Sequence, residues 1–174
     1  MIDFSNIDID LDSIPKVETT NFNSLDNRYR NVLIIKSLLF SAILFTIYFL
    51  VFFMVQNNVS TTLKIFVLVL LLIQFFTGLY FSYFGFKKKK YKLRQHDIIY
   101  KTGLWWTSET AVPFVRVQHN EIVQGPVERL FGLAKLKLYT AGGHSSDLSI
   151  PGLKPETARK LKDFITKRIE EEEE

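Results

Sequence analysis

Cysteine is absent from this 174-residue chain. Disulfides, thiolate metal sites and a nucleophilic cysteine are therefore excluded. The three histidines, His96, His119 and His144, lack the spacing of zinc ligands, so we expect no metal site. The segment 142–147 (GGHSSD) holds residue types used in hydrolysis, but triad members converge from separated elements, and we interpret it as a hairpin turn. The sequence thus predicts neither a cofactor nor enzymatic activity.

Charged residues are nearly absent from two long apolar runs. Residues 32–55 contain one, Lys36, and residues 65–86 contain none. A bilayer core of about 30 Å needs roughly 20 residues of helix, and a helix satisfies its own backbone hydrogen bonds within lipid. Buried helices of a soluble core are the alternative, but they rarely stay uncharged over this length. We therefore predict two transmembrane helices, 32–55 and 65–86, joined by a short external loop.

Polar and small residues recur on both runs at the three- and four-residue spacing of one helix face. A mid-membrane amide such as Gln74 favours a partner on a neighbouring helix, and small residues let helix backbones approach. We expect the two faces to meet. Their members are Ser37, Ser41, Phe45, Tyr48 and Phe52 on the first run, and Gln74, Thr77, Gly78, Phe81, Ser82 and Gly85 on the second.

Basic residues flank the two runs unevenly. Arg28, Arg30, Lys36 and the run 87–90 lie on one side, and Lys64 alone lies on the other. Basic residues near a span stay on the cytoplasmic face. The sequence therefore predicts a multi-pass membrane protein with both termini in the cytoplasm.

Outside the hairpin the chain divides into three parts. Residues 1–31 are polar and acidic, and we predict a mostly disordered tail, although alternating apolar residues between Phe4 and Ile14 would also suit a strand added to a sheet edge. Residues 87–169 are long enough to bury a core. Residues 170–174 are five glutamates, which we expect to fray because they oppose the helix dipole.

The part from residue 87 to 169 shows strand and turn patterns. The clearest alternation lies at 133–141, and shorter runs predict strands at 91–95, 98–101, 104–107, 115–123 and 148–150. Residues 125–132 predict one or two helical turns, since Pro126 suits a helix start and Gly132 a helix end. Residues 155–169 predict an amphipathic helix. The expected fold is a membrane α-helical hairpin plus a small strand barrel or sandwich closed by a C-terminal helix.

This order of elements resembles the bacterial pleckstrin-homology-like (PH-like) domains that are flanked by membrane helices. The resemblance covers roughly residues 91–169, and the preceding hairpin is common in that family. It implies a mainly-β PH-like fold at the bacterial cytoplasmic (inner) membrane. The residues that carry it are Arg116, Val117 and Gln118, Ile122 to Pro126, Arg129 to Leu133, Leu136, and Thr140 to Gly143.

Ten residues are candidates for contact with lipid headgroups or a partner. Juxtamembrane lysines gain about 1 kcal/mol each from anionic headgroups, and interfacial tryptophans lie at the same level. In a strand, two adjacent tryptophans point to opposite faces, so we expect one of them to be exposed. Pleckstrin-homology domains bind phosphoinositides through basic residues of their first strands, a pattern that two candidates faintly resemble. The candidates are Lys87, Lys88, Lys89, Lys90, Lys92 and Arg94, the last two carrying that pattern, with Trp105, Trp106, Arg116 and Arg129.

Two functions follow from these expectations. The first is a module without catalysis that assembles at the membrane, as a homo-oligomer or with another membrane protein. The alternative is a domain that binds or senses anionic lipid at the inner membrane surface. The basic run is too short to predict nucleic-acid binding.

Overall fold

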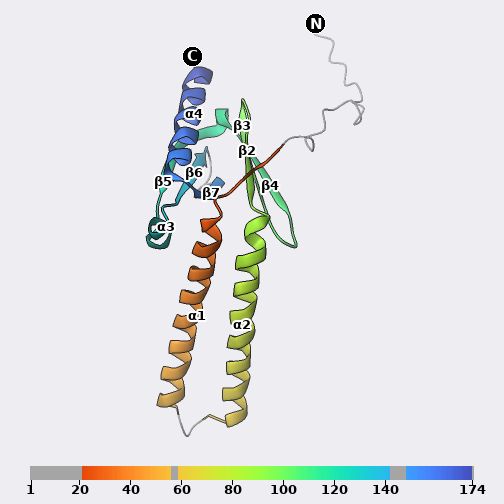
Figure 1. The fold of residues 1–174 in the computed structure, drawn as a ribbon, viewed down its shortest axis with the longest axis vertical. Coiled ribbons are helices and arrows are strands. Elements are labelled where there is room, and N and C mark those ends of the chain that lie inside the picture. The colour runs from red at the N-terminus through yellow and green to blue at the C-terminus, as the bar shows by residue number, and fades with distance from the viewer. Residues whose placement is uncertain (1–20, 56–58, 142–147, 174) are drawn as a thin grey trace, which may run out of the picture.

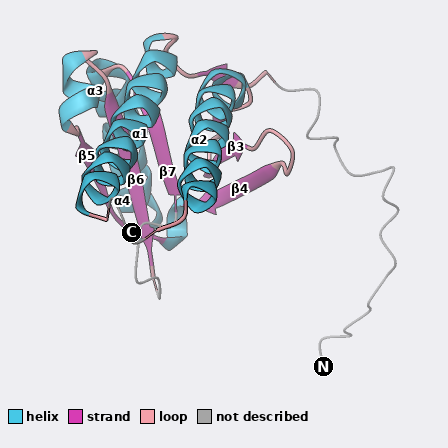
Figure 2. Ribbon diagram, turned by 90° about the horizontal axis from the view of Figure 1, so that it is seen from below, coloured by secondary structure: helices cyan, strands magenta, loops and turns pink. Residues whose placement is uncertain are grey.

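The computed structural model describes residues 21–55, 59–141 and 148–173. Two long helices project from a domain of two small sheets and a further helix, and the two helices lie side by side (Figures 1 and 2). The elements follow the order β1 (Asn23–Ser24), α1 (Arg28–Met54), α2 (Thr61–Lys87), β2 (Lys90–Leu93), β3 (Asp97–Thr102), β4 (Ser108–Pro113), η3 (Phe114–Arg116), β5 (Val117–Val123), α3 (Pro126–Leu130), β6 (Ala134–Thr140), β7 (Leu148–Leu153) and α4 (Pro155–Glu173).

Helices α1 and α2 have 27 residues each, or about 40 Å at 1.5 Å per residue. Both begin four residues before the predicted spans. Only 6% of the apolar stretch of either helix is buried within the chain, which excludes a pair of buried helices in a soluble core. Their exposed apolar side chains match the lipid phase of a membrane, as predicted.

The two helices meet through the small and polar residues that the sequence indicated. The Ser41 hydroxyl donates to the side-chain oxygen of Gln74 at 3.3 Å, and the Tyr48 hydroxyl donates to the Lys64 carbonyl at 3.1 Å. A Cβ at Gly78 would lie 2.5 Å from the Ser37 hydroxyl oxygen, so only glycine fits there without a shift. These contacts confirm the predicted interface. Three predicted members behave differently: Thr77 bonds its own helix, Phe81 packs on Trp105, and Gly85 has open space beside it.

The domain consists of two antiparallel sheets. One has the order β1-β2-β3-β4 and the other β5-β6-β7. Helix α4 packs on β5, β6 and η3, and its residues Ala158, Leu161 and Ile165 enter the core. Strand β6 shows the predicted alternation, with Ala134, Leu136 and Leu138 buried. Helix α4 continues through Glu173, so most of the expected acidic tail is helical. The predicted turn at 142–147 lies outside the described residues.

One predicted strand is wrong. Residues 104–107 form a loop, and the strand in this region is β4, which begins at Ser108. Gly103 has a φ of 116°, and a Cβ there would overlap the Trp106 carbonyl oxygen. The chain therefore turns tightly at Gly103, because only glycine adopts this backbone readily, and pairing with β3 resumes only at Ser108.

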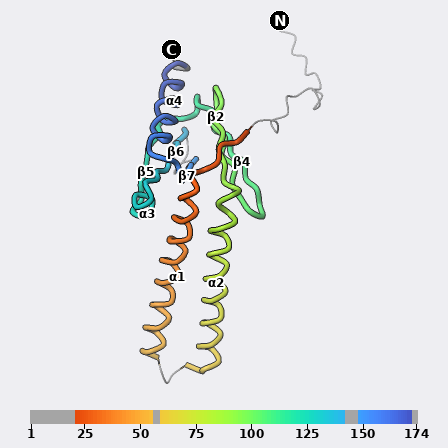
Figure 3. Tube along the Cα trace, in the orientation of Figure 1, coloured from red at the N-terminus to blue at the C-terminus, as the bar shows by residue number. Residues whose placement is uncertain are grey.

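Residues 22–32 belong to the domain instead of a disordered tail. Strand β1 pairs with β2, and the Asp26 amide donates to the Gly152 carbonyl on β7 at 3.0 Å. Leu25, Tyr29 and Val32 are buried in the same core as the sheets. The segment crosses from β2 to β7 before entering α1, which Figure 3 shows in red. The prediction of a disordered tail is therefore wrong for residues 22–31. Residues 1–20 of that predicted tail lie outside the described residues. The membrane hairpin is an insertion between the first and second strands of the domain.

Candidate functional site

Lysines of α2, β2 and β3 gather at the end of the domain from which the helices emerge. Helix α2 ends at Lys87, a short turn follows, and β2 begins at Lys90. Lys90 pairs with Lys101 of β3, which puts both side chains on one face of the sheet. These residues line a hollow of about 410 Å³, which we call the basic hollow. Its lining residues are Phe22, Lys87, Lys88, Lys90 and Lys101.

The basic hollow has an excess of positive charge. The Lys101 ammonium lies 3.3 Å from a Glu109 carboxylate oxygen and 5.7 Å from the Phe22 ring. The Lys87 ammonium lies 5.7 Å from the Tyr83 ring. Within the described part of the chain, no carboxylate lies in ion-pair contact with Lys87, Lys88 or Lys90. Four ammonium groups therefore face one carboxylate, an arrangement that suits an anionic ligand such as a phosphate group.

Lys89 points away from the rest of the lysine run. Its ammonium lies 5.6 Å from the ring of Tyr29, on the α1 side. Burial lowers the pKa of Lys89, and the nearby charges of Lys135 and Lys36 lower it further. The predicted group of four adjacent lysines thus separates into three that line the basic hollow and one that is half-buried between the helices and the domain.

Glu128 on α3 joins α1 to the domain. Its side chain is buried, and it accepts a hydrogen bond from the Lys36 ammonium at 2.5 Å. Burial acts to raise the pKa of Glu128, but the hydrogen bond and charge of Lys36, with a further contribution from Lys135, hold it below its ordinary value. The one charge of the first apolar run is therefore paired with a domain carboxylate.

The loop of residues 103–107, here called the tryptophan loop, extends along α2 (Figure 1). The Trp105 ring packs edge-on against Phe81 with centroids 5.5 Å apart. Phe81 precedes the end of α2 by six residues, or about 9 Å of helix rise. Trp105 is 69% exposed and Trp106 is 84% exposed. The expectation of one exposed tryptophan in a strand is thus wrong, since both are exposed on a loop at the depth of the apolar span.

Four other candidates lie away from this cluster. Lys92 lies further along β2 and Arg94 directly after its end, away from α2, and Arg94 is 3.6 Å from the Asp97 carboxylate. Arg116 ends η3, which follows β4 at that same distant end. Arg129 is exposed on α3, on the α1 side. The structure therefore does not bring these four together with the basic hollow.

Sequence reasoning missed Phe22 and Lys101. Lys101 lies in a predicted strand, but its place opposite Lys90 depends on the β2–β3 register, which is set by the turn between the strands. Phe22 lies in a segment that we expected to be disordered. Only a signal for strand pairing between residues 23–24 and 90–91 could have located it.

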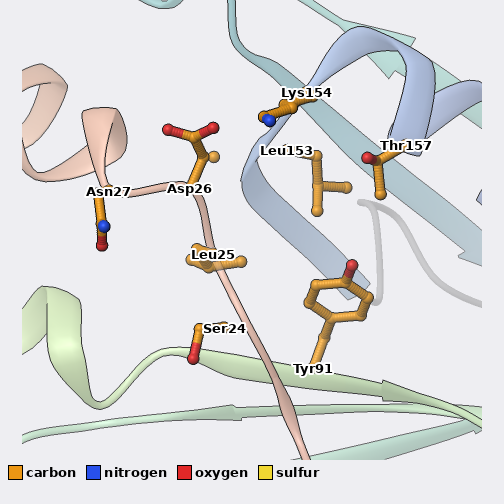
Figure 4. A pocket seen from close by; sticks show the side chains of 9 residues that line it. Ser24, Leu25, Asp26, Asn27, Tyr91, Leu153, Lys154 and Thr157 are labelled. Atoms are coloured by element: carbon orange, nitrogen blue, oxygen red, sulfur yellow. The ribbon is translucent and has the colours of Figure 1, made fainter.

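A second hollow, of about 460 Å³, lies where the N-terminal segment meets the start of α4 (Figure 4). Asp26, Asn27, Lys154 and Thr157 are among its polar lining residues. The Asp26 carboxylate accepts hydrogen bonds from the Arg28 guanidinium at 3.0 and 3.1 Å, which lower the pKa of Asp26. Among the described residues, no three His, Asp or Glu side chains gather as a metal site would require.

The fold and site define a membrane protein with a PH-like domain. The family model described as Bacterial PH domain matches residues 33–169, and the chain belongs to this family. The matched region begins after β1, so the segment that completes the domain at Leu25 and Tyr29 lies outside it.

The chain is also similar to the UPF0699 transmembrane protein YdbS of Bacillus subtilis (strain 168). The two are 36% identical over 78 residues, which cover 45% of this chain and 47% of YdbS. The match thus spans about half the length of that relative. No solved structure gives a significant match.

Proposed function

We propose that this protein is a non-enzymatic membrane module whose PH-like domain binds anionic lipid headgroups at the inner surface of the bacterial cytoplasmic membrane. The observation that carries the proposal is the basic hollow, which begins at the last residue of α2. At that position its lysines are at headgroup level, and the proposal places both chain termini in the cytoplasm. The exposed tryptophans on the same side of the hairpin support it, since their rings favour the interface.

Short-chain lipids test this proposal on the full-length protein. Dioctanoyl phosphatidylglycerol and dioctanoyl phosphatidylcholine would be titrated by calorimetry into the protein in a neutral detergent. We expect the anionic phosphatidylglycerol to bind more tightly than the zwitterionic phosphatidylcholine. Replacing Lys88 and Lys101 together by Gln should weaken it roughly 30-fold, at about 1 kcal/mol for each lysine.

The matched control is replacement of Arg159 and Lys160 by Gln. Both are exposed on α4, and the double change removes the same charge at a distance from the membrane end. It should leave the affinity unchanged. Equal binding of the two lipids by the unmodified protein, or an equal loss in both double variants, would contradict a specific role for the basic hollow.

Assembly with another membrane protein or a second copy stays a second candidate. Strand β4 is the outer strand of its sheet, and most of its residues are exposed. Such an edge can accept a strand from a partner. Mass measurement in mild detergent tests this candidate, and a monomer that co-purifies with no other protein would count against it.

A further inference from the structure

A groove of about 440 Å³ separates the tryptophan loop from the last turns of α2. Phe81, Gly85 and Lys89 line it from the helix side, and Leu104, Trp105 and Trp106 from the loop side. The basic hollow has an entirely different lining. Phe81 and Trp105, which face each other across the groove, have their rings in contact within the depth of the apolar span.

The groove changes from apolar to cationic along its length. Phe81 and Gly85 lie one turn apart on the same face of α2, and Lys89 follows just beyond the end of the helix. An aromatic ring thus lies at membrane depth, and an ammonium lies at the level where the helix leaves the membrane. A phospholipid beside a helix has the same order, with its acyl chains deep and its phosphate at the surface.

Gly85 leaves the centre of the groove open. A Cβ there would have no heavy atom within 4 Å, in contrast to Gly78, which is pressed against Ser37. Gly85 lies in the last turn of α2, where its carbonyl accepts the capping N–H of Lys88, and no neighbouring side chain requires a glycine there. Glycine in a helix costs up to about 1 kcal/mol relative to alanine. An acyl chain lying across Gly85 would fill the space.

Lys89 lines the surface end of the groove, and its half-buried ammonium lies 5.6 Å from the Tyr29 ring, between the groove and α1. Among the described residues, no carboxylate is in ion-pair contact with it, and Lys36 and Lys135 are close enough to disfavour its positive charge. Glu128, the nearby carboxylate, is bonded to Lys36. A bound phosphate would supply the missing negative charge.

We propose that this groove binds one anionic phospholipid, with an acyl chain beside Gly85 against Phe81 and Trp105, and with its phosphate at Lys89. The site deepens the proposed function and rests on it in one respect, namely that the domain stands at the surface of an anionic bilayer. Because its residues differ from those of the basic hollow, the two sites can be tested separately.

The two tryptophans, the only ones in the chain, provide a direct reporter. A Trp106→Phe variant leaves Trp105, the groove residue that contacts Phe81, as the single fluorophore. The full-length variant would be reconstituted in phosphatidylcholine vesicles that contain a small fraction of either brominated phosphatidylglycerol or brominated phosphatidylcholine. Bromine quenches tryptophan at short range. We expect brominated phosphatidylglycerol to quench Trp105 at an about fivefold lower fraction than brominated phosphatidylcholine, as one additional lysine contact predicts.

Two further substitutions in the same background locate the lipid. Gly85→Phe should fill the groove and abolish the difference between the two lipids, without a penalty for folding since the position is open and helical. Lys89→Gln should remove the difference between the two brominated lipids, while both lipids should still quench Trp105. Leu72→Phe is the matched control, because it enlarges an exposed α2 residue outside the groove, and it should change nothing.

Equal quenching by the two lipids at every fraction would overturn the groove as an anionic site. A difference that survives Gly85→Phe would also overturn it. The Lys88→Gln/Lys101→Gln variant separates the two proposals: if it removes the difference and Lys89→Gln does not, the signal belongs to the basic hollow and the groove is not the site. If the Lys88→Gln/Lys101→Gln variant binds short-chain phosphatidylglycerol as tightly as the unmodified protein while the quenching results hold, the basic hollow is refuted and the groove stands.

Discussion

Helices α1 and α2 have the same length and similar composition, but they join the PH-like domain in different ways. The first turns of α1 are part of the domain core through Tyr29 and Val32, and Lys36 one turn later is paired with the buried Glu128. Helix α2 has no buried residue, and it reaches β2 through a two-residue turn. Among its side-chain contacts with the domain, Phe81 packs on Trp105, and the partly buried Phe86 packs on Tyr29 at the edge of the core.

The end of the domain that faces the membrane therefore has two sides: the α1 side holds the fold together, and the α2 side carries the candidate binding residues. The α1 side contains buried side chains and a satisfied charge pair. The α2 side contains the basic hollow, the groove and the exposed tryptophan loop. Substitutions on the α1 side should therefore change stability, and substitutions on the α2 side should change lipid binding.

The largest effect should come from removing the aromatic ring that α1 places in the core. Tyr29→Ala should lower the free energy of unfolding by about 3–5 kcal/mol, the usual loss for a buried aromatic residue. Thermal unfolding of the full-length protein in detergent measures this change. Tyr83→Ala on α2 is the matched control, since Tyr83 is exposed, and it should have a much smaller effect. Equal losses for the two variants would mean that the helices do not differ as described.

A smaller effect should come from breaking the charge pair between α1 and α3. Lys36→Met leaves the buried Glu128 carboxylate without its hydrogen-bond donor. The full penalty for breaking a buried pair is 3–5 kcal/mol, but Lys36 is about half exposed, so we expect about 2 kcal/mol. Urea unfolding at pH 7 measures it. A loss below a few tenths of a kcal/mol would show that the pair does not fasten α1 to the domain.

The same pair predicts a pH dependence. The pKa of Glu128 in the folded protein lies below its ordinary value of 4.5, so the pair stabilises the fold above about pH 4.5, and this contribution is lost as the pH falls through the lowered pKa. In Lys36→Met, burial favours the neutral acid, and protonation relieves the unpaired charge. The difference in unfolding free energy between this variant and the unmodified protein should therefore shrink as the pH is lowered from 7 to 4. A difference that is constant over this range would contradict the assignment.

The smallest effect should come from the hydrogen bond between the two helices. Ser41→Ala removes the donor to the Gln74 side chain. Such bonds in membranes contribute about 0.6 kcal/mol on average, so the unfolding free energy should fall by less than 1 kcal/mol. Steric trapping or detergent unfolding of the full-length protein measures this change. A loss above 2 kcal/mol would indicate that the amide has a larger role than joining the helices.

The features that the sequence predicted well are local ones. The two spans follow from unbroken apolar runs, and their contact face follows from the spacing of Ser41, Gln74 and Gly78. Strand β6 and helix α4 follow from clear periods of two and 3.6 residues. Each of these signals lies within a single element or between two neighbouring elements.

The features that were missed depend on contacts between distant parts of the chain. Leu25 and Tyr29 lie in a polar segment, and their burial requires pairing with β2 and β7, which are more than 60 residues away. Lys101 joins the basic hollow only because β2 and β3 adopt one particular register. The tryptophan loop was mistaken for a strand because its apolar residues resemble one, while the turn is set by Gly103.

The central claim is that the membrane end of the PH-like domain faces the inner leaflet, and cysteine labelling tests it most directly. The chain has no cysteine, so single cysteines can be placed at Thr61, an exposed residue where α2 begins, and at Lys160, an exposed residue on α4. In intact cells, a membrane-impermeant maleimide should label the cysteine at 61 and should label that at 160 only after permeabilisation. Labelling of position 160 but not of position 61 in intact cells would place the domain on the opposite side of the membrane and contradict the account.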